Sequence, residues 1–251
     1  MTDQIAVGID IGGTGIKGAL VDTAAGTLLG ERIRFATPSG GEPEDIVRVV
    51  SDILAQLDID RETPVGICFP SSIRHGITLL AANISQRWIG FEAEAFFTKE
   101  LGRPIHFIND ADAAGFAEVA YGAACDQSGL VIMTTLGTGI GAAMIYNGVL
   151  IPNAELGHLE IDGHDAETQA SNAAREREGL SFTQWAARLQ RFYSHVEMLF
   201  SPDLFIVGGG VSKNHEDFLP LLKLNTPIVP ATLLNKAGIM GAAALAAKLD
   251  Q

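Results

Sequence analysis

Hydrophobic and polar residues alternate at two places in the chain as a β-hairpin requires. Near the start, apolar side chains at every second position are interrupted by Gly12-Gly13 and resume in the segment 16–22. The pattern returns later, with the segments 130–136 and 142–151 on either side of a glycine-rich turn. This repetition predicts a duplicated architecture of two α/β lobes, each opening with a glycine-interrupted hairpin.

Other segments have the spacing of amphipathic helices. Apolar residues recur at helical intervals from Ile46 to Leu57, after two acidic residues that suit the first turn of a helix. A longer helix is predicted after Ser181, which suits an N-cap, and its aromatic residues are interpreted as one buried face and not as a platform for stacking a ligand. The remaining pattern predicts strands at 28–35, 64–70, 104–108 and 204–210 and helices at 111–122 and 237–249.

Composition indicates a globular protein. The chain has 251 residues, of which 47% are hydrophobic and 19% charged. It has no run of about 18 or more uncharged apolar residues and no basic-then-apolar start, so we expect neither a membrane span nor a signal peptide. Cys68 and Cys125 lie far apart in apolar surroundings, which indicates buried thiols in a reducing compartment. The expected location is the cytoplasm.

The net charge of -13 excludes broad attraction to nucleic acids or anionic lipids, because both depend on clustered lysines and arginines. An anionic substrate would need a local site. Backbone N–H groups, a few cations and a metal ion can build such a site without changing the overall charge.

The glycine-rich segments are candidates for such a site. In the segment from Asp10 to Lys17, glycines let backbone N–H groups approach phosphate oxygens, Thr14 adds a hydroxyl and Asp10 could hold Mg²⁺ through water. The alternative is a hairpin turn that merely needs glycine; two further glycine turns after predicted strands weaken it. The candidate phosphate-binding residues are Asp10, Gly12, Gly13, Thr14, Lys17, Gly137, Thr138, Gly139, Gly209 and Gly210.

Two polar segments are candidates for binding and activating a hydroxyl acceptor. Asn109-Asp110 lies between a predicted strand and a predicted helix, and Asp110 is either a general base or a cap of a helix that begins at Ala111. Glu155, His158 and Glu160 offer two carboxylates and an imidazole within six residues, a set that can bind several hydroxyls of one sugar.

These motifs, in this order, resemble the ROK family of sugar kinases and repressors, in the actin-like ATPase superfamily. The resemblance rests on DIGGTGIK, IND, GTGIG, ELGH and VGGGVS, and it spans nearly the whole chain. ELGHLEIDG and REREGLSF are also similar to the branch of bacterial polyphosphate glucokinases that includes the polyphosphate/ATP-glucomannokinase type.

The resemblance implies an actin-like (ribonuclease H-like) α/β fold with a cleft between two lobes. The smaller lobe is expected at 1–108 plus 236–251 and the larger at 109–235. It implies a kinase that phosphorylates the 6-hydroxyl of glucose, and also of mannose, with ATP or inorganic polyphosphate and Mg²⁺. Asp110 is the expected base, and the expected sugar-binding residues are Asn83, Asn109, Asp110, Glu155, His158 and Glu160.

The sequence departs from many family members in two ways. The DIGGT motif begins at Asp10, which leaves no room for a helix-turn-helix, and no cysteine-rich motif follows His158, so we expect no structural zinc. A sugar-responsive regulator, an ATP-only hexokinase and an actin-like assembly ATPase remain as alternatives. The preferred donor and a monomeric or homodimeric state stay open. Cations that could line a path for a polyphosphate chain are Arg74, Arg87, Arg175, Arg177 and Lys213.

Overall fold

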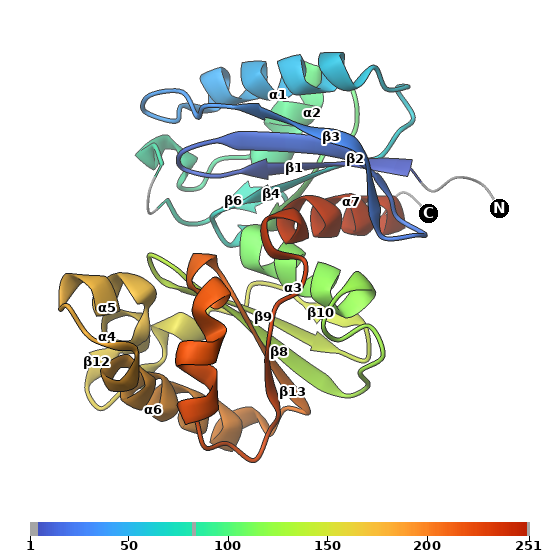
Figure 1. The fold of residues 1–251 in the computed structure, drawn as a ribbon. Coiled ribbons are helices and arrows are strands. Elements are labelled where there is room, and N and C mark those ends of the chain that lie inside the picture. Colours follow the sequence, from blue (N-terminus) through green and yellow to red (C-terminus); the bar gives the residue numbers. More distant parts are fainter. Residues whose placement is uncertain (1–4, 82–83, 250–251) are drawn as a thin grey trace. The chain divides into compact units, whose positions relative to one another are not determined.

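A computed structural model describes residues 5–81 and 84–249 of the chain (Figure 1). The chain forms two compact units, one comprising residues 1–117 and 235–251 and the other comprising residues 118–234. Each unit has its own five-stranded sheet and its own hydrophobic core. No helix within the described ranges is both long enough and apolar enough to cross a membrane.

The first unit is built on a mixed sheet with the strand order β3-β2-β1-β4-β7. Its first three strands are antiparallel neighbours, as the alternating pattern predicts, and β1, β4 and β7 run parallel. Every residue of β4 is buried, because helices cover both faces of the sheet here. The strands are β1 (Ile5–Ile11), β2 (Ile16–Asp22), β3 (Thr27–Phe35), β4 (Val65–Phe69) and β7 (His106–Asn109), with a small ribbon of β5 (Ile73–Arg74) and β6 (Ile77–Thr78).

Two helices pack their apolar faces on one side of this sheet and a third packs on the other. The amphipathic helix predicted around Ile46 forms and contributes to the main core of the unit. On the opposite side the last helix lies so close that a Cβ on Gly8 would be 1.8 Å from the carbonyl oxygen of Ile239, so only glycine fits there. The helices are α1 (Pro43–Leu57), α2 (Ala93–Leu101), α3 (Asp110–Tyr121) and α7 (Ala237–Leu249), with 3₁₀ turns η1 (Gln86–Trp88) and η5 (Leu234–Lys236).

The second unit repeats the strand order of the first, as β10-β9-β8-β13-β14. Again three antiparallel neighbours are followed by parallel pairs, so the duplicated architecture predicted from the two hairpins is confirmed. The strands are β8 (Leu130–Leu136), β9 (Ile140–Tyr146), β10 (Val149–Ile151), β13 (Leu204–Gly208) and β14 (Ile228–Pro230), with a ribbon of β11 (Glu160–Ile161) and β12 (His164–Asp165).

The long helix α6 (Phe182–Phe200) supplies much of the core of the second unit. Ser181 caps it, and Gln184 completes a capping box. Trp185, Phe192 and Tyr193 are fully buried, so the interpretation of the aromatic residues as a core face is confirmed. The other helical segments are α4 (Ala166–Ala170), α5 (Asn172–Arg177), η2 (Leu156–His158), η3 (Gly210–Asp217) and η4 (Leu219–Leu221).

The structure differs from the sequence-based description in its details. The segment 142–151, expected as one strand, contains a turn at Asn147-Gly148, where Asn147 has a positive φ of 49°. Cys68 is buried as expected, but Cys125 is exposed in the turn after α3, so the expectation of two buried thiols is wrong for Cys125.

The division into units also lies at different positions. Residues 109–117, expected in the larger lobe, belong to the first unit. The reason is that β7 pairs with β4 up to Asn109, and that α3 packs against α7, where Gly241 touches the backbone of Ala113.

Candidate active site

The first glycine turn, Gly12 to Gly15, joins β1 to β2. The N–H of Gly12 donates to the carbonyl oxygen of Gly15 at 3.0 Å, and the hydroxyl of Thr37 donates to the Gly12 carbonyl oxygen at 2.5 Å. Gly13 and Thr14 are exposed, and within the described residues their N–H groups make no backbone hydrogen bond. The turn therefore presents two N–H groups to a bound anion.

Asp10 lies two residues before this turn and holds the lysine across the hairpin. Its Oδ2 is 3.1 Å from Nζ of Lys17, and the thiol of Cys68 donates to its Oδ1 at a sulfur–oxygen distance of 3.8 Å. Burial, helped by the charge of Asp10, raises the pKa of Cys68 well above its ordinary value, so the thiol stays protonated and donates. Both carboxylate oxygens are engaged by the protein, and Mg²⁺ bound through water fits here.

The Asn109-Asp110 pair stands where β7 ends and α3 begins. Oδ1 of Asn109 accepts from the N–H of Asp112 at 3.0 Å, which is the contact of an N-cap, and its Nδ2 donates to the carbonyl oxygen of Ser71 at 3.1 Å. Asn109 is thus the capping residue, and the helix begins at Asp110. The Asp110 side chain is exposed, and its Oδ1 accepts from the N–H of Ala111 at 2.8 Å.

The parallel strands bring the candidate base and the first glycine turn to one edge of the sheet. In the β1–β4 register Asp10 pairs with Cys68, and in the β4–β7 register Phe69 pairs with Asn109. The charges of Asp10 and Asp110 both raise the pKa of Cys68, so the two carboxylates lie within electrostatic reach of one thiol. The structure therefore places Asp10 and Asp110 in the same part of the first unit.

The second glycine turn, Gly137 to Gly139, joins β8 to β9 and is fixed by contacts from two later segments. The Gly137 N–H donates to the Gly139 carbonyl oxygen at 3.0 Å, and the Ala173 N–H donates to the Gly137 carbonyl oxygen, also at 3.0 Å. Oε2 of Glu167 accepts from the N–H of Ile140 at 3.0 Å. A carboxylate thus holds the end of this turn.

The third glycine turn lies beside the second. Gly209 has φ of 85°, and a Cβ there would be 2.5 Å from the carbonyl oxygen of Leu136, the last residue of β8. Gly210 begins η3, and Thr138 is exposed at the tip of the second turn. Within the second unit, the candidate phosphate-binding residues around Thr138 and Gly209 are therefore neighbours.

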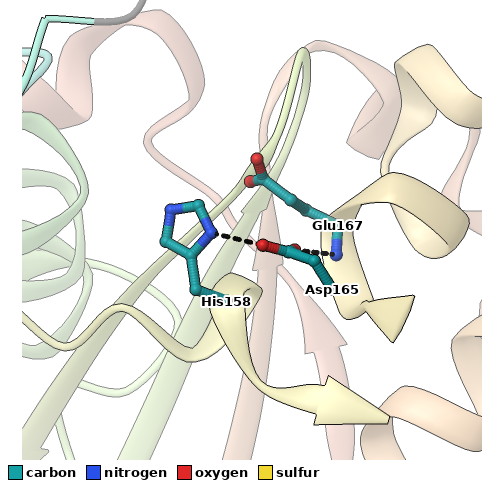
Figure 2. A group of neighbouring side chains, drawn as sticks. All are labelled: His158, Asp165 and Glu167. Atoms are coloured by element: carbon teal, nitrogen blue, oxygen red, sulfur yellow. Dashed lines mark hydrogen bonds and ion pairs between the residues drawn. The ribbon is translucent and has the colours of Figure 1, made fainter. Parts of the chain in front are cut away.

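Figure 2 shows His158 beside two carboxylates, Asp165 and Glu167. Nδ1 of His158 is 2.9 Å from Oδ2 of Asp165, and Oδ1 of Asp165 accepts from the N–H of Glu167 at 3.2 Å. The hydrogen bond to Asp165 raises the pKa of His158, and the charges of Glu167 and Glu155 add to the effect. Ligand atoms of the three residues lie within 4.8 Å of one another.

These contacts do not require a metal ion. His158 and Asp165 bond to each other, and Glu167 bonds to the backbone of Ile140, so hydrogen bonds account for the arrangement. The imidazole of the cluster can donate a hydrogen bond to a sugar hydroxyl, and its two carboxylates can accept hydrogen bonds from sugar hydroxyls. The absence of a structural zinc ion stays a prediction.

The other predicted sugar-binding residues, besides Asn109 and Asp110, differ in their surroundings. Glu155 lies close enough to His158 to affect its pKa, whereas Glu160 is exposed in β11 and, among the described residues, makes no hydrogen bond to His158. Asn83 lies outside the described residues. Sequence reasoning missed Asp165 and Glu167; the signal was the series of acidic residues that follows the ELGH segment, where Asp165 ends the β11–β12 ribbon and Glu167 lies in the first turn of the next helix.

Three of the cations proposed for a donor path are already engaged. Arg87 pairs with two glutamates of the α1 region, Arg177 pairs with Glu178, and Arg175 pairs with Glu176 while its guanidinium lies 4.7 Å from the ring centroid of Phe182. Arg74 and Lys213 are exposed. Whether they line a donor path stays a prediction.

The sequence matches a known family over most of its length. Residues 6–175 match the model of the ROK family. The chain belongs to the ROK family. A polyphosphate glucokinase of Mycobacterium tuberculosis is 42% identical over 243 residues, which cover 96% of this ROK chain and 91% of the relative.

Solved structures of other ROK proteins resemble this one closely. The inorganic polyphosphate/ATP-glucomannokinase from Arthrobacter sp. strain KM matches with a TM-score of 0.89 and 54% identity, covering 98% of this chain and 99% of that chain. A ROK family glucokinase from Streptomyces griseus, solved in complex with glucose and AMPPNP, matches with a TM-score of 0.78 and 25% identity, covering 97% and 99%. The α/β fold of actin-like type that the sequence predicts is confirmed.

Proposed function

We propose that this chain transfers the terminal phosphoryl group of inorganic polyphosphate or ATP to the 6-hydroxyl of glucose, and also of mannose. Relatives named for these donors and sugars are similar to it over nearly the whole chain. The observation that carries the proposal is the place of Asp110, which lies at the same sheet edge as the first glycine turn while Asn109 makes the capping contact.

In this mechanism Asp110 is the general base. The 6-hydroxyl oxygen of the sugar attacks the terminal phosphorus, and its proton passes to the carboxylate of Asp110. The bond from that phosphorus to the bridging oxygen breaks, and ADP or a polyphosphate shorter by one phosphate leaves. Positioning and stabilisation of the transferring charge supply most of the rate in reactions of this kind.

The donor phosphates contact the glycine turns. The N–H groups of Gly13 and Thr14 and the ammonium of Lys17 are proposed to bind the phosphate that is transferred or its neighbour, with Gly12 shaping the turn. Gly137, Thr138, Gly139, Gly209 and Gly210, in the second and third turns, stay the further phosphate-binding candidates of the sequence prediction. Mg²⁺, held by Asp10 through water, would neutralise part of the donor charge.

The residues proposed to bind the sugar are those of the sequence prediction, Asn83, Asn109, Asp110, Glu155, His158 and Glu160. Asp165 orients His158 by a hydrogen bond at 2.9 Å. Glu167 contacts the same cluster and the second glycine turn, so sugar binding and donor binding share one carboxylate.

The proposed setting is the cytoplasm. Both cysteines are free thiols, and one of them, Cys125, is exposed. An exposed free thiol suits a reducing compartment. A monomer and a homodimer are both compatible with the mechanism, and light scattering of the purified chain would decide between them.

The decisive experiment combines two sugars with two donors. Purified chain is incubated with glucose or mannose and with ATP or polyphosphate, with and without Mg²⁺, and the product is identified by phosphorus NMR. We expect sugar 6-phosphate with both donors and no reaction after Mg²⁺ is removed. If neither donor yields a sugar phosphate, the proposed function is wrong; phosphate on a different hydroxyl would refute the proposed geometry at Asp110.

A further inference from the structure

A guanidinium that the sequence analysis did not select lies against the first glycine turn. A Cβ built on Gly15 would be 3.3 Å from Nε and 3.6 Å from Nη2 of Arg34. In the β2–β3 register Arg34 pairs with Lys17, whose ammonium is held by Asp10. The absence of a side chain at Gly15 therefore leaves room for an arginine against this end of the turn.

A second arginine extends this cationic surface along β3. Three residues of β3, ending with Arg32, stand opposite the single residue Ala19, because the register shifts there. Such bulges redirect side chains. Here Nη1 of Arg32 donates to the carbonyl oxygen of Asn235 at 2.9 Å, in η5, where Lys236 is the following residue. Arg34 at the turn, Arg32 beyond it and Lys236 at the far end are called the basic track below.

The three cations of the basic track are exposed and lack acidic partners. Within the described residues no salt bridge involves any of them, whereas Arg87 and Arg177 are each paired with glutamates. The neighbouring side chains of β3, Ile33 and Phe35, pack on the core. Because side chains alternate between the two faces of a strand, Arg32 and Arg34 lie on the face away from that core. Without carboxylate partners, the two arginines keep guanidinium N–H groups for a ligand.

We propose that the basic track binds the phosphates of a long inorganic polyphosphate that follow the one at the first glycine turn. The inference rests on the proposed function, since it assigns the route of one of the two donors. Guanidinium groups form paired hydrogen bonds with phosphate, and a line of cations matches a linear polyanion that carries charge at every unit. A nucleotide has too few phosphates to reach the end of the track, so the track favours polyphosphate over ATP.

The test removes the charges of the track and compares donors. The double variant R32Q/R34Q, with K236Q added in a triple variant, is assayed with glucose and long polyphosphate, tripolyphosphate or ATP. The matched control is R48Q, an exposed arginine on α1 that pairs with Asp45. A polyphosphate-binding measurement without sugar, by retention of long polyphosphate on immobilised protein, provides a readout independent of catalysis.

We expect R32Q/R34Q to lower kcat/KM for long polyphosphate about tenfold, because each exposed ion pair contributes up to about fivefold. The loss with ATP or tripolyphosphate should be at least about three times smaller, since short donors leave most of the track empty. The slope of log kcat/KM against log salt should fall by about 0.7 for each cation removed. Retention of long polyphosphate should fall in parallel, and R48Q should match the unmodified chain in every measurement.

The outcomes separate this inference from the proposed function. If the unmodified chain phosphorylates glucose with neither donor, the function itself is wrong. If the chain uses polyphosphate normally but the double variant behaves like R48Q, or loses both donors equally, the basic track is not the route and the function stands. If the chain uses ATP alone, the track has no polyphosphate to bind and the inference is overturned while kinase activity remains.

Discussion

The two glycine turns occupy the same place in two sheets with the same strand order, yet different side chains support them. The first turn is flanked by the Asp10–Lys17 pair and by the guanidinium of Arg34. The second turn has Thr135 and Gly141 at the positions across the hairpin that Asp10 and Lys17 occupy in the first. The two units therefore share the strand order and the position of the turn, but not the side chains around it.

Support for the second turn comes from a carboxylate. Glu167 accepts from the N–H of Ile140 and also lies beside His158. A negative charge facing a bound phosphate would repel it, so this carboxylate is useful only if it turns toward the backbone or toward sugar hydroxyls. The difference indicates a division of labour, in which the first turn meets the charge of the donor and the second connects the donor to the acceptor.

The largest predicted effect tests whether the chemistry belongs to the first unit. The substitution D110N should lower kcat about 100- to 10,000-fold, because the amide cannot take the proton of the attacking hydroxyl. Glucose binding, followed by calorimetry, and the thermal unfolding midpoint should change little, since Asn109 and not Asp110 makes the capping contact. Turnover near that of the unmodified chain would show that Asp110 is not the base.

A smaller effect is expected when a methyl group is added to the second turn. A Cβ at position 139 would lie 2.2 Å from Oε2 of Glu167, so G139A must push this carboxylate away from the N–H of Ile140. A lost hydrogen bond to a charged group costs about 1.5–3 kcal/mol. We therefore expect kcat/KM for glucose to fall by about tenfold or somewhat more, for every donor.

Two comparisons make the G139A result specific. At Gly137 a Cβ would meet nothing within 4 Å, so G137A shows how much of the loss comes from a methyl group in the turn itself. In an E167A background G139A should add little, because the contact that it breaks is already absent. Fully additive losses would mean that Glu167 does not transmit the effect.

The matching change in the first turn should be weaker and should depend on the donor. G15A brings a Cβ within 3.3 Å of Nε of Arg34, a contact that a small movement of the flexible arginine relieves. We expect an about threefold to fivefold loss in kcat/KM with long polyphosphate and less with ATP. If G15A and R34Q act through the same guanidinium, the double variant should be no worse than R34Q; an equal loss with both donors would contradict the division of labour.

Much of the fold was predictable because it follows from local patterns. The first hairpin, the helix around Ile46 and the capped helix after Ser181 are all set by periodicity and capping, which a sequence displays directly. The turn at Asn147-Gly148 was missed because both flanking segments are apolar, and only its asparagine-glycine pair reveals the reversal.

The candidate site was less predictable where it depends on distant pairing. Arg34 approaches Gly15 only through the β2–β3 register, and Glu167 reaches Ile140 from a segment after the ELGH motif. The choice of Asn109 as cap instead of Asp110 needed the side-chain geometry, since either residue type suits the position. Charge alone also does not distinguish paired from unpaired cations, and only the structure shows that Arg87 and Arg177 pair with nearby glutamates.

The smallest expected effect concerns protonation of His158 in the second unit. Its pKa is raised, chiefly by the hydrogen bond to Asp165, so the pair is charged and stabilising below the ordinary histidine pKa of about 6.5. The stabilisation is then lost as the pH rises through the raised pKa of the folded state. D165N should therefore lower the pKa of His158 and remove this pH dependence.

The measurement is a titration of the His158 ring by NMR, with the signal assigned by its loss in H158Q. The control is D162N, which removes a carboxylate from the same segment but one that pairs with Arg191 instead of His158. In the unmodified chain and in D162N the ring should titrate above about 6.5, and in D165N closer to that value. If His158 contacts the sugar, the pH dependence of KM for glucose should shift in the same direction by a few-fold, while KM for the donor should not. An unchanged titration in D165N would show that Asp165 does not control the imidazole, and Glu167 would then be the only carboxylate of this cluster with an assigned role in the second unit.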